Sequence, residues 1–306
     1  MRLSPGHPTT ARDTDANLDV WTRPEAGSSS SAAPRAADTP LLGKLIAAVR
    51  KRGYSIKTEQ TYLHWTARFL KFHGDGSPDS LSGQDVAAFL EYLAVRRKVS
   101  ASTQNIALNA LAFFFERALE RPLGDLGGFI RARGARRLPV VLSREEVRSL
   151  LARMGGQSWL MAALLYGTGM RLMECVRLRV LDVDFAYAQI TVRQGKGGKD
   201  RVVPLPEPAV PQLREHLDRV QAIFERDRAA GFGEVYIPEA LARKYPNAPK
   251  EWGWRWVFPA SRRSPDPRSN ASRRHHIHET VLQKAIRTAA KDAGISKRVT
   301  THTLRH

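Results

Sequence analysis

A basic segment that contains a proline divides this chain into two hydrophobic stretches, and this division constrains the fold more than any other feature. Residues 126–142 include four arginines between positions 131 and 137, and Pro139 follows them. Helical periods of apolar residues precede the segment, and a mixture of helical and strand periods follows it. At 306 residues the chain is long enough for two domains. We therefore predict a helical domain at 39–125, a linker at 126–142 and a second domain at 143–306.

The first stretch has the pattern of a compact helical domain that follows a disordered leader. Residues 1–38 are rich in Ser, Ala, Pro and Thr and show no hydrophobic period. Thr39 can cap a helix that has Pro40 at its first position. Three further helices are expected from about Thr58, from Ser82 and over about 102–119. Core packing explains their apolar stripes, and the residues expected to point inward include Tyr62, Trp65, Phe69, Phe72, Val86, Phe89, Ile106, Leu111 and Phe114.

The second stretch combines helices with a short hairpin. Ser143 and Glu146 have the spacing of a capping box, which begins a helix. Gly167-Thr168-Gly169 indicates a turn after Tyr166, and a helix with Arg171 and Glu174 follows it. Alternating residues at 189–193 and 201–205 predict two strands. Helices at about 209–229 and 279–293 flank an irregular segment at 231–277. The expected fold class is α+β, mainly helical with a small hairpin or sheet.

Charge and cysteine content narrow the function classes. Lys and Arg number 49 against 30 Asp and Glu, which gives a net charge of +19. Such an excess attracts polyanions, with nucleic acid first and an anionic membrane second. The single Cys175 excludes an internal disulfide and is expected to pack in the core. No apolar run is long enough to span a bilayer, and no signal peptide is evident. We expect a cytoplasmic protein that has DNA and no membrane as its partner.

Four side chains of the second stretch have the chemistry that strand transfer at a phosphodiester requires. Arg171 and Arg305 can bind the non-bridging oxygens bidentately without losing charge. Lys196, in the glycine-rich turn between the strands, can protonate the leaving oxygen. His302 can assist proton movement at the nucleophile. Glu174 lies one helical turn from Arg171 and can orient a catalytic side chain. With two arginines at the phosphate, neither a metal nor another cofactor is needed.

Taken singly, these residues have simpler explanations. Arg171 alone is typical of a surface arginine, and Lys196 and Lys199 alone are typical of an exposed hairpin. The turn does not match a phosphate-binding loop, because Arg193 replaces the first glycine and Asp200 replaces Ser or Thr. His302 and His306 have the i, i+4 spacing of a zinc site, but no carboxylate or cysteine ligand is evident beside them. The order and spacing of the three motifs together carry the argument.

The motifs are Gly-Thr-Gly-Met-Arg-Leu-Met-Glu at 167–174, Gly-Lys-Gly-Gly-Lys-Asp-Arg at 195–201 and His-Thr-Leu-Arg-His at 302–306. In this order they resemble the signature of the tyrosine recombinases, which are phage-integrase-like enzymes. The resemblance implies an N-terminal core-binding, SAM-like domain and a catalytic domain that form a clamp around duplex DNA. It also implies strand cleavage through a 3′-phosphotyrosine, a Holliday junction and a homotetramer, without ATP or metal. Arg171, Lys196, His302 and Arg305 would be the catalytic residues, and the enzyme would act at the bacterial nucleoid.

Residues 231–277 are similar to the extra segment of integron integrases, and we name them the insertion. That resemblance implies capture or excision of gene cassettes and recognition of folded single strands by their extrahelical bases. Trp254 and His276 are expected near such a base, because tryptophan stacks on bases. The alternative for Trp254 and Trp256 is packing of the insertion onto its domain. Further DNA contacts are expected from Arg131, Arg133, Arg136, Arg137, Lys199, Arg201, Arg273, Arg274 and His275.

The nucleophile of the family is a tyrosine that follows the last motif. All seven tyrosines of this chain precede His302. We therefore expect a catalytic domain that is incomplete as given, from a partial gene, from a natural truncation or with a different nucleophile. The alternative function is a catalytically inert DNA-binding protein with a recombinase fold. A type IB topoisomerase uses a similar set of residues, but the insertion argues against it.

This expectation can be tested with a suicide substrate, which traps the covalent intermediate. The 306-residue chain should bind such DNA and yield no protein–DNA adduct on a denaturing gel, because the attacking hydroxyl is missing. The same chain with a C-terminal extension that restores a His and a later Tyr should yield the adduct. An adduct from the 306-residue chain would contradict the expectation.

Overall fold

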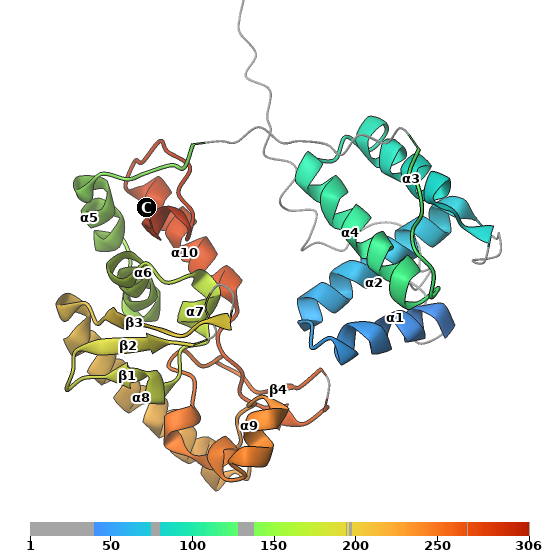
Figure 1. Cartoon of the computed structure of the whole chain (residues 1–306). Coiled ribbons are helices and arrows are strands. Elements are labelled where there is room, and N and C mark those ends of the chain that lie inside the picture. The colour runs from blue at the N-terminus through green and yellow to red at the C-terminus, as the bar shows by residue number, and fades with distance from the viewer. Residues whose placement is uncertain are drawn as a thin grey trace, which may run out of the picture. The chain divides into compact units, whose positions relative to one another are not determined.

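The protein consists of two compact units. The computed structural model describes residues 40–74, 80–127, 138–193, 195, 198–267 and 269–305. Backbone contacts separate a first unit that ends at Arg136 from a second unit that begins at Arg137 (Figure 1). This boundary falls within the predicted linker. The leader, Thr39 and the four linker arginines, Arg131, Arg133, Arg136 and Arg137, lie outside the described residues.

The first unit contains four helices, α1 (Pro40–Lys51), α2 (Ile56–His73), α3 (Gly83–Val95) and α4 (Ala101–Arg117). A serine precedes each of the last three and caps its first turn. Ser55 accepts a hydrogen bond from the backbone N–H of Thr58 at 3.1 Å. Ser82 forms a reciprocal capping box with Asp85. These caps satisfy donors that a helix leaves unpaired at its start, and so the sequence fixes where each helix begins.

Aromatic side chains fill the core of this unit, as the helical stripes predict. Trp65, Phe69, Phe89 and Phe114 are almost completely buried. Two expectations were wrong. Phe72 is 42 % exposed, because it lies in the last turn of α2 and packs at the rim against Phe89 and Tyr92. Ile106 is also exposed, because it borders a groove between α2 and α4 instead of the core.

The second unit joins helices to a three-stranded antiparallel sheet. The capping box between Ser143 and Glu146 is confirmed at the start of α5 (Arg144–Ala152). The sheet has the order β1-β2-β3, with β1 at Val183–Asp184, β2 at Gln189–Val192 and β3 at Arg201–Pro204. Strand β1 was not predicted, because two residues are too few for an alternating pattern. The remaining main helices are α6 (Gly156–Thr168), α7 (Leu172–Val176), α8 (Val210–Ala229) and α10 (Glu279–Asp292).

Helix α6 lies at the centre of this unit. It contacts α5, α7, α8, α10 and strand β3, as the arrangement of the ribbons also indicates (Figure 1). Leu160, Leu164 and Leu165 of α6 are fully or almost fully buried in the main core. Cys175 lies in the same core, and burial raises the pKa of its thiol, which agrees with a packing role. A mainly helical fold with a small sheet is thus confirmed.

The insertion contains short elements around a small core of its own. It holds α9 (Glu239–Lys244), two short 3-10 helices and a minimal hairpin of β4 (Ser264–Pro265) and β5 (Ser272–Arg273). Trp256 is buried in this core beside Val235 and Ile237. An isolated β-bridge between Arg179 and Trp256 joins the insertion to the rest of the unit. A second bridge, between Pro259 and His276, lies within the insertion.

Among the described helices, none combines the length and the apolarity that crossing a bilayer requires.

The different burial of two phenylalanines predicts different stabilities. Phe114→Ala removes a fully buried ring from the first unit and should lower its free energy of unfolding by about 3–5 kcal/mol. Phe72→Ala should cost about 1 kcal/mol or less, because its ring already touches water. Urea unfolding followed by circular dichroism measures both. Equal losses would contradict the placement of Phe72 at the rim.

Candidate active site

A tight turn between α6 and α7 positions Arg171. Gly169 ends α6 in the left-handed conformation, with φ 63°, and its N–H donates to the carbonyl oxygen of Leu165 at 3.1 Å. The predicted turn therefore begins later than expected, since Gly167 is still helical. A side chain at Gly167 would collide with Pro206, whose Cγ would lie 2.3 Å from the added Cβ. The glycines thus serve two different purposes, one in packing and one in the turn.

Glu174 is bonded to two arginines that lie far apart in the sequence. Its carboxylate accepts a hydrogen bond from Nη1 of Arg171 at 2.7 Å and two from Arg201, at 2.6 and 3.1 Å. The backbone N–H of Arg171 also donates to it at 2.7 Å. Burial alone raises the pKa of Glu174, but the hydrogen bonds from Arg201 and Arg171 outweigh it and lower the pKa to about 2. Glu174 is therefore a permanent anion that orients both guanidinium groups.

Arg201 reaches this carboxylate from strand β3, where it pairs with Val192 of β2. Its guanidinium lies against the turn between the strands. A Cβ on Gly195 would come within 2.8 Å of Arg201 Nη1 and of the carbonyl oxygen of Lys199. Glycine is therefore required at position 195 for this packing. Lys199 is exposed on the turn, whereas Lys196 lies outside the described residues.

The last motif places Arg305 beside the turn that carries Arg171. Thr303–Arg305 form a 3-10 helix that packs on α6, with Leu304 buried beneath it. Nε of Arg305 donates to the carbonyl oxygen of Gly169 at 2.6 Å. Burial and the nearby positive charges of Arg171 and Arg201 lower the pKa of Arg305. The neighbouring His302 is exposed to solvent.

The described residues thus bring together four members of the expected set, Arg171, Glu174, Arg201 and Arg305. Two of the three guanidinium groups bind the one carboxylate and the third lies beside them, and so the cluster carries excess positive charge. Such a cluster suits a phosphate, which can accept charge-assisted hydrogen bonds from more than one arginine. Arg201 was expected to contact DNA, but its donors bind Glu174. We therefore assign it to the support of Arg171.

Several residues of the insertion that were predicted to contact DNA are bonded to other groups of the second unit. Nε and Nη2 of Arg274 bind the carboxylate of Asp227 at 2.6 and 2.9 Å, and Nη1 donates to two backbone carbonyls. These bonds commit the guanidinium to packing, and so we leave Arg274 out of the proposed DNA surface. Arg273 and His275 both lie near buried Asp266, with closest distances of 3.8 and 3.9 Å.

The tryptophans of the insertion enclose a guanidinium. The central carbon of Arg179 lies 3.8 Å from the ring centre of Trp256 and 5.6 Å from that of Trp254. His276 meets the Trp256 ring edge-on at 5.3 Å, and burial lowers the pKa of this histidine. Trp254 is half-buried, and Trp256 is buried. Both tryptophans therefore take part in packing, the alternative that the sequence left open.

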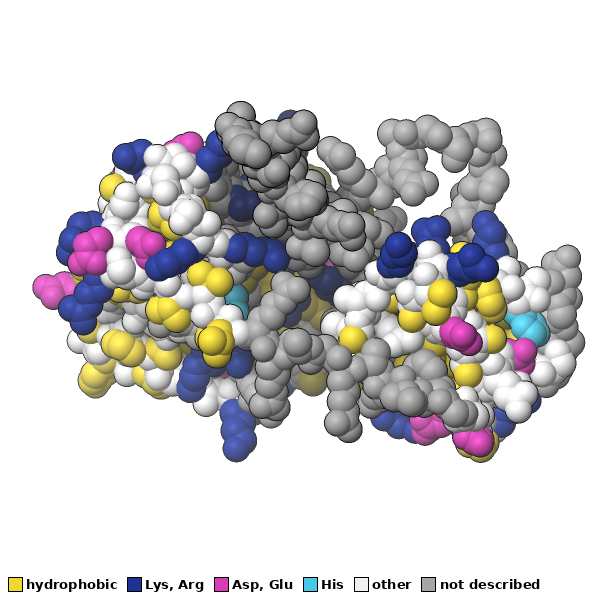
Figure 2. Space-filling model, turned by 90° about the horizontal axis from the view of Figure 1, so that it is seen from above, with side chains coloured by type: hydrophobic (Ala, Val, Ile, Leu, Met, Phe, Trp, Pro, Cys, Tyr) yellow, Lys and Arg dark blue, Asp and Glu magenta, His cyan; other side chains and the backbone are white. Residues whose placement is uncertain are grey.

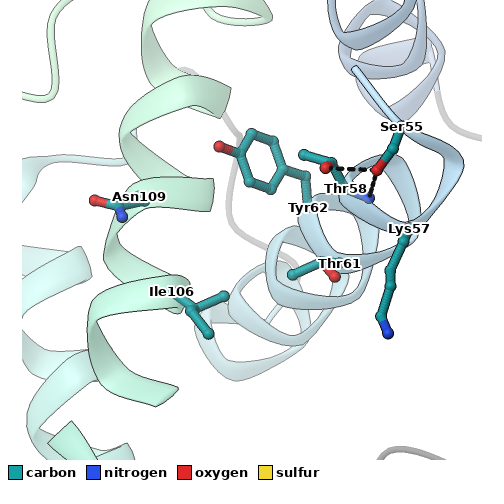
Figure 3. A pocket seen from close by; sticks show the side chains of 7 residues that line it. All are labelled: Ser55, Lys57, Thr58, Thr61, Tyr62, Ile106 and Asn109. Carbon is teal, nitrogen blue, oxygen red and sulfur yellow. Dashed lines mark hydrogen bonds between the residues drawn. The ribbon is translucent and has the colours of Figure 1, made fainter. Parts of the chain in front are cut away.

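A polar groove of about 340 Å³ lies in the first unit between the start of α2 and α4 (Figure 3). Its rim includes the helix cap, where Ser55 Oγ lies 2.9 Å from Thr58 Oγ1. Lys57 and Tyr62 line the same groove, with Asn109 opposite them on α4. The sequence did not indicate this groove, because its lining residues come from helices about 50 positions apart.

Sequence reasoning also missed an ionic cluster near the sheet, in which Arg179 and Asp182 are buried and Arg193 is half exposed. Asp182 accepts a hydrogen bond from Arg193 Nε at 2.5 Å and another from the backbone N–H of Arg179 at 3.0 Å. The spacing of Arg179 and Asp182, three positions apart, was the available signal. Burial, which decides its importance, is not visible in the sequence.

The state of Glu174 predicts a pH-dependent stability. Glu174→Gln should lower the free energy of unfolding by about 1–3 kcal/mol at pH 7, because two charged donors lose their acceptor. A folded pKa of about 2 lies below the unfolded value of 4.5, and so the stabilisation is present above pH 4.5 and is lost as the pH falls towards 2. The difference between the two proteins should therefore shrink over that range in urea unfolding. Glu215→Gln, at an exposed ion pair on α8, is the control and should change little; a difference of constant size would argue against the predicted pKa.

Comparison with protein families supports the two-unit description. Residues 41–125 match the family described as "Phage integrase, N-terminal SAM-like domain". Residues 141–306 match the "Phage integrase family". Together the two matches include nearly all of the described residues.

Individual relatives are similar over most of the chain. An "Integrase/recombinase" of Escherichia coli is 47 % identical over 266 residues, which cover 87 % of this chain and 79 % of the relative. The tyrosine recombinase XerD of Mycobacterium leprae is 30 % identical and covers 89 % of this chain and 83 % of the relative. Among solved structures, a lambda integrase tetramer bound to a Holliday junction has a TM-score of 0.55 and 15 % identity, with 87 % of this chain and 69 % of that chain covered. XerH bound to difH in a pre-cleavage complex gives a TM-score of 0.52 at 18 % identity and covers 86 % of this chain and 72 % of that chain.

At these low identities the structures establish the fold alone. The family matches go further, because together they span both units and include the motifs that form the arginine cluster. The relative that is 47 % identical covers 87 % of this chain. The chain belongs to the phage integrase family of tyrosine recombinases.

Proposed function

We propose that this protein, when full length, is a site-specific DNA recombinase of the integron-integrase type, which breaks and rejoins DNA strands to capture or excise gene cassettes. One observation carries the proposal. Arg305 is bonded to the carbonyl oxygen of Gly169, beside Arg171, and Glu174 joins Arg171 to Arg201. This cluster has the charge and the donors that a scissile phosphate needs.

Each catalytic residue has a distinct role in the proposed reaction. Arg171 and Arg305 hold the non-bridging oxygens and stabilise the negative charge that grows on them as the nucleophile attacks. Lys196, which follows Gly195 in the strand turn, donates a proton to the leaving 5′-oxygen. His302 assists proton transfer at the attacking oxygen. In the family the attacking group is a tyrosine that follows the last motif. Its hydroxyl would bond to the phosphorus as the 5′-hydroxyl leaves, which gives a 3′-phosphotyrosine, and the reverse reaction with a different 5′-hydroxyl rejoins the strands.

The proposed partner is DNA, both as duplex and as a folded single strand, with four protomers in the synaptic complex. A net charge of +19 supports it, and Lys and Arg side chains are scattered over the visible face of the second unit (Figure 2). In the first unit, the groove beside Ser55 and Lys57 offers hydrogen-bond donors and the positive end of α2 to the DNA backbone. The lambda integrase of similar fold was solved as a tetramer on a Holliday junction. We place this activity in the bacterial cytoplasm, at the nucleoid.

The integron type is supported by the insertion and by its aromatic content. Trp254 is half-buried, so that part of its ring can meet a base, and His276 lies in the same segment, against the ring of Trp256. Arg273, His275 and exposed Lys199 remain further proposed contacts with nucleic acid. The linker arginines 131, 133, 136 and 137 complete the proposed surface as a strap along the phosphate backbone.

Binding to DNA that carries a single methylphosphonate tests the phosphate clamp without any cleavage. The substitution removes the charge of one phosphate at a time from a hairpin site that the protein selects from a randomised pool. For the wild type, one position should weaken binding about tenfold, which is about 1.4 kcal/mol. Arg171→Ala and Arg305→Ala should bind the unmodified site and lose this position-specific effect, because the charge has lost its partner.

Arg219→Ala is the matched control, since the side chain of Arg219 is exposed on α8 and pairs with Glu215. It should keep the full effect at that position. If no phosphate couples to Arg171 or Arg305, the assignment of these arginines to the phosphate is wrong.

A separate comparison addresses the integron type. The hairpin with extrahelical bases should bind more tightly than its fully paired duplex, and equal affinity would argue against that type while leaving the recombinase intact.

A further inference from the structure

A buried guanidinium is one of the groups that join the insertion to the rest of the second unit. Arg179 is 8 % exposed and lies over the ring of Trp256. Its Nη2 donates to the carbonyl oxygen of Tyr236 at 2.9 Å, and Nη1 donates to that of Trp254. The backbone on both sides of Arg179 also pairs with the insertion, since Val257 donates to Leu178 and Val180 donates to Arg255. Residue 179 is therefore held by side-chain and backbone contacts at once.

The next contact leads from Arg179 to the sheet. Asp182 is 5 % exposed and accepts a hydrogen bond from the backbone N–H of Arg179 at 3.0 Å through Oδ2. Its other oxygen, Oδ1, accepts from Nε of Arg193 at 2.5 Å. Arg193 directly follows strand β2 and precedes the turn that contains Gly195. The carboxylate thus connects the loop after α7 to the point where β2 ends.

The sheet carries this connection into the arginine cluster. Val192, the neighbour of Arg193, pairs with Arg201 across the two strands. Arg201 binds Glu174, which binds Arg171. Across the turn, Gly195 donates to the carbonyl oxygen of Lys199 at 2.9 Å, and Gly198 donates to that of Gly195 at 2.9 Å. Displacement of the end of β2 would therefore disturb both the turn and the support of Arg171.

Stability does not explain why charges stand at this position. Burial lowers the pKa of Arg179 to about 10 and raises the pKa of Asp182, and so burial opposes the charged form of each. Buried ion pairs often stabilise a protein no more than apolar residues of the same volume do. They do impose a defined geometry, because charge-assisted hydrogen bonds depend on direction. A role in positioning fits these residues better than a role in stability.

We propose that Asp182 is a positioning residue that holds the β2–β3 turn at the phosphate site through Arg193, and that Arg179 anchors it to the insertion. The inference deepens the proposed function, in which this turn carries the proton donor. It assigns to the insertion a second task, namely the support of the catalytic turn. Its test does not depend on recombinase activity, because the position of the turn is measured without DNA.

Amide hydrogen exchange on the whole chain provides that measurement. Asp182→Asn keeps the shape of the side chain and removes its charge. The amides of Gly195 and Gly198 should then exchange about tenfold faster, as expected for the loss of one charge-assisted hydrogen bond. Arg193→Gln removes the other partner of the same hydrogen bond and should give the same increase. Because the Arg193 side chain is half exposed, this variant should keep its fold even if Asp182→Asn does not. The double variant should exchange no faster than either single variant.

Asp184→Asn is the matched control. Asp184 lies two positions further along, in β1, and its side chain accepts from the N–H groups of Ala186 and Tyr187 in a different turn. It should leave the amides of Gly195 and Gly198 unchanged. Unchanged exchange in Asp182→Asn and Arg193→Gln would overturn the proposal. An equal increase along α6 and α10 would also overturn it, because that pattern reports general destabilisation.

Arg179→Met tests the anchor. It removes the guanidinium that binds Tyr236 and Trp254 and keeps an apolar chain against Trp256. Exchange should increase about threefold or more both at Val235, whose N–H donates to Pro249, and at Gly195. An increase confined to Val235 would show that the insertion does not support the turn, and would refute that part of the proposal.

In the methylphosphonate assay, Asp182→Asn should weaken the coupling of Arg171 to its phosphate. If coupling is absent even in the wild type, the proposed function fails while the exchange result stands.

Discussion

The rest of the site depends on the hydrogen bonds that the carboxylate of Glu174 accepts from Arg171 and Arg201. Arg171 and Arg201 come from different parts of the sequence, and their like charges would repel each other without an anion between them. Glu174 supplies that anion and stays ionised, because the hydrogen bonds that it accepts lower its pKa to about 2. Arg305 then joins the cluster through the carbonyl oxygen of Gly169. One negative charge among three positive charges leaves an excess that a phosphate can balance.

Arginine has a second use in this protein, as a structural donor inside the insertion. Arg179, Arg255 and Arg274 all donate to backbone carbonyl groups of irregular segments. A segment with few regular elements leaves carbonyl groups unpaired, and buried carbonyl groups need donors. The guanidinium group supplies several donors from one side chain. A high net charge therefore overstates the surface that is available to DNA, and the number of arginines does not measure a binding site.

Local features of the sequence predicted much of the fold. The start at Ser82, the capping box at Ser143 and the helical stripes place the helices within a few residues of their observed bounds. The errors lie near the ends of helices, where the sequence pattern continues but the packing changes. Phe72 follows the stripe of α2 but lies at the rim of the core, where α3 covers only part of its ring. Gly167 resembles a turn residue, yet it is helical and is small because Pro206 packs against it.

The sequence by itself determined the helical starts, the two-unit division and the residue types of a phosphate site, because caps, periodicity and motifs depend on neighbours along the chain. Only the tertiary structure decided which arginines act together. Arg305 lies 136 positions from Gly169, and Arg274 lies 47 positions from Asp227. No local rule distinguishes an arginine that faces the site from one that is buried against a distant carboxylate. That choice depends on which surfaces the packed helices and the sheet bring together, and on how much water they exclude.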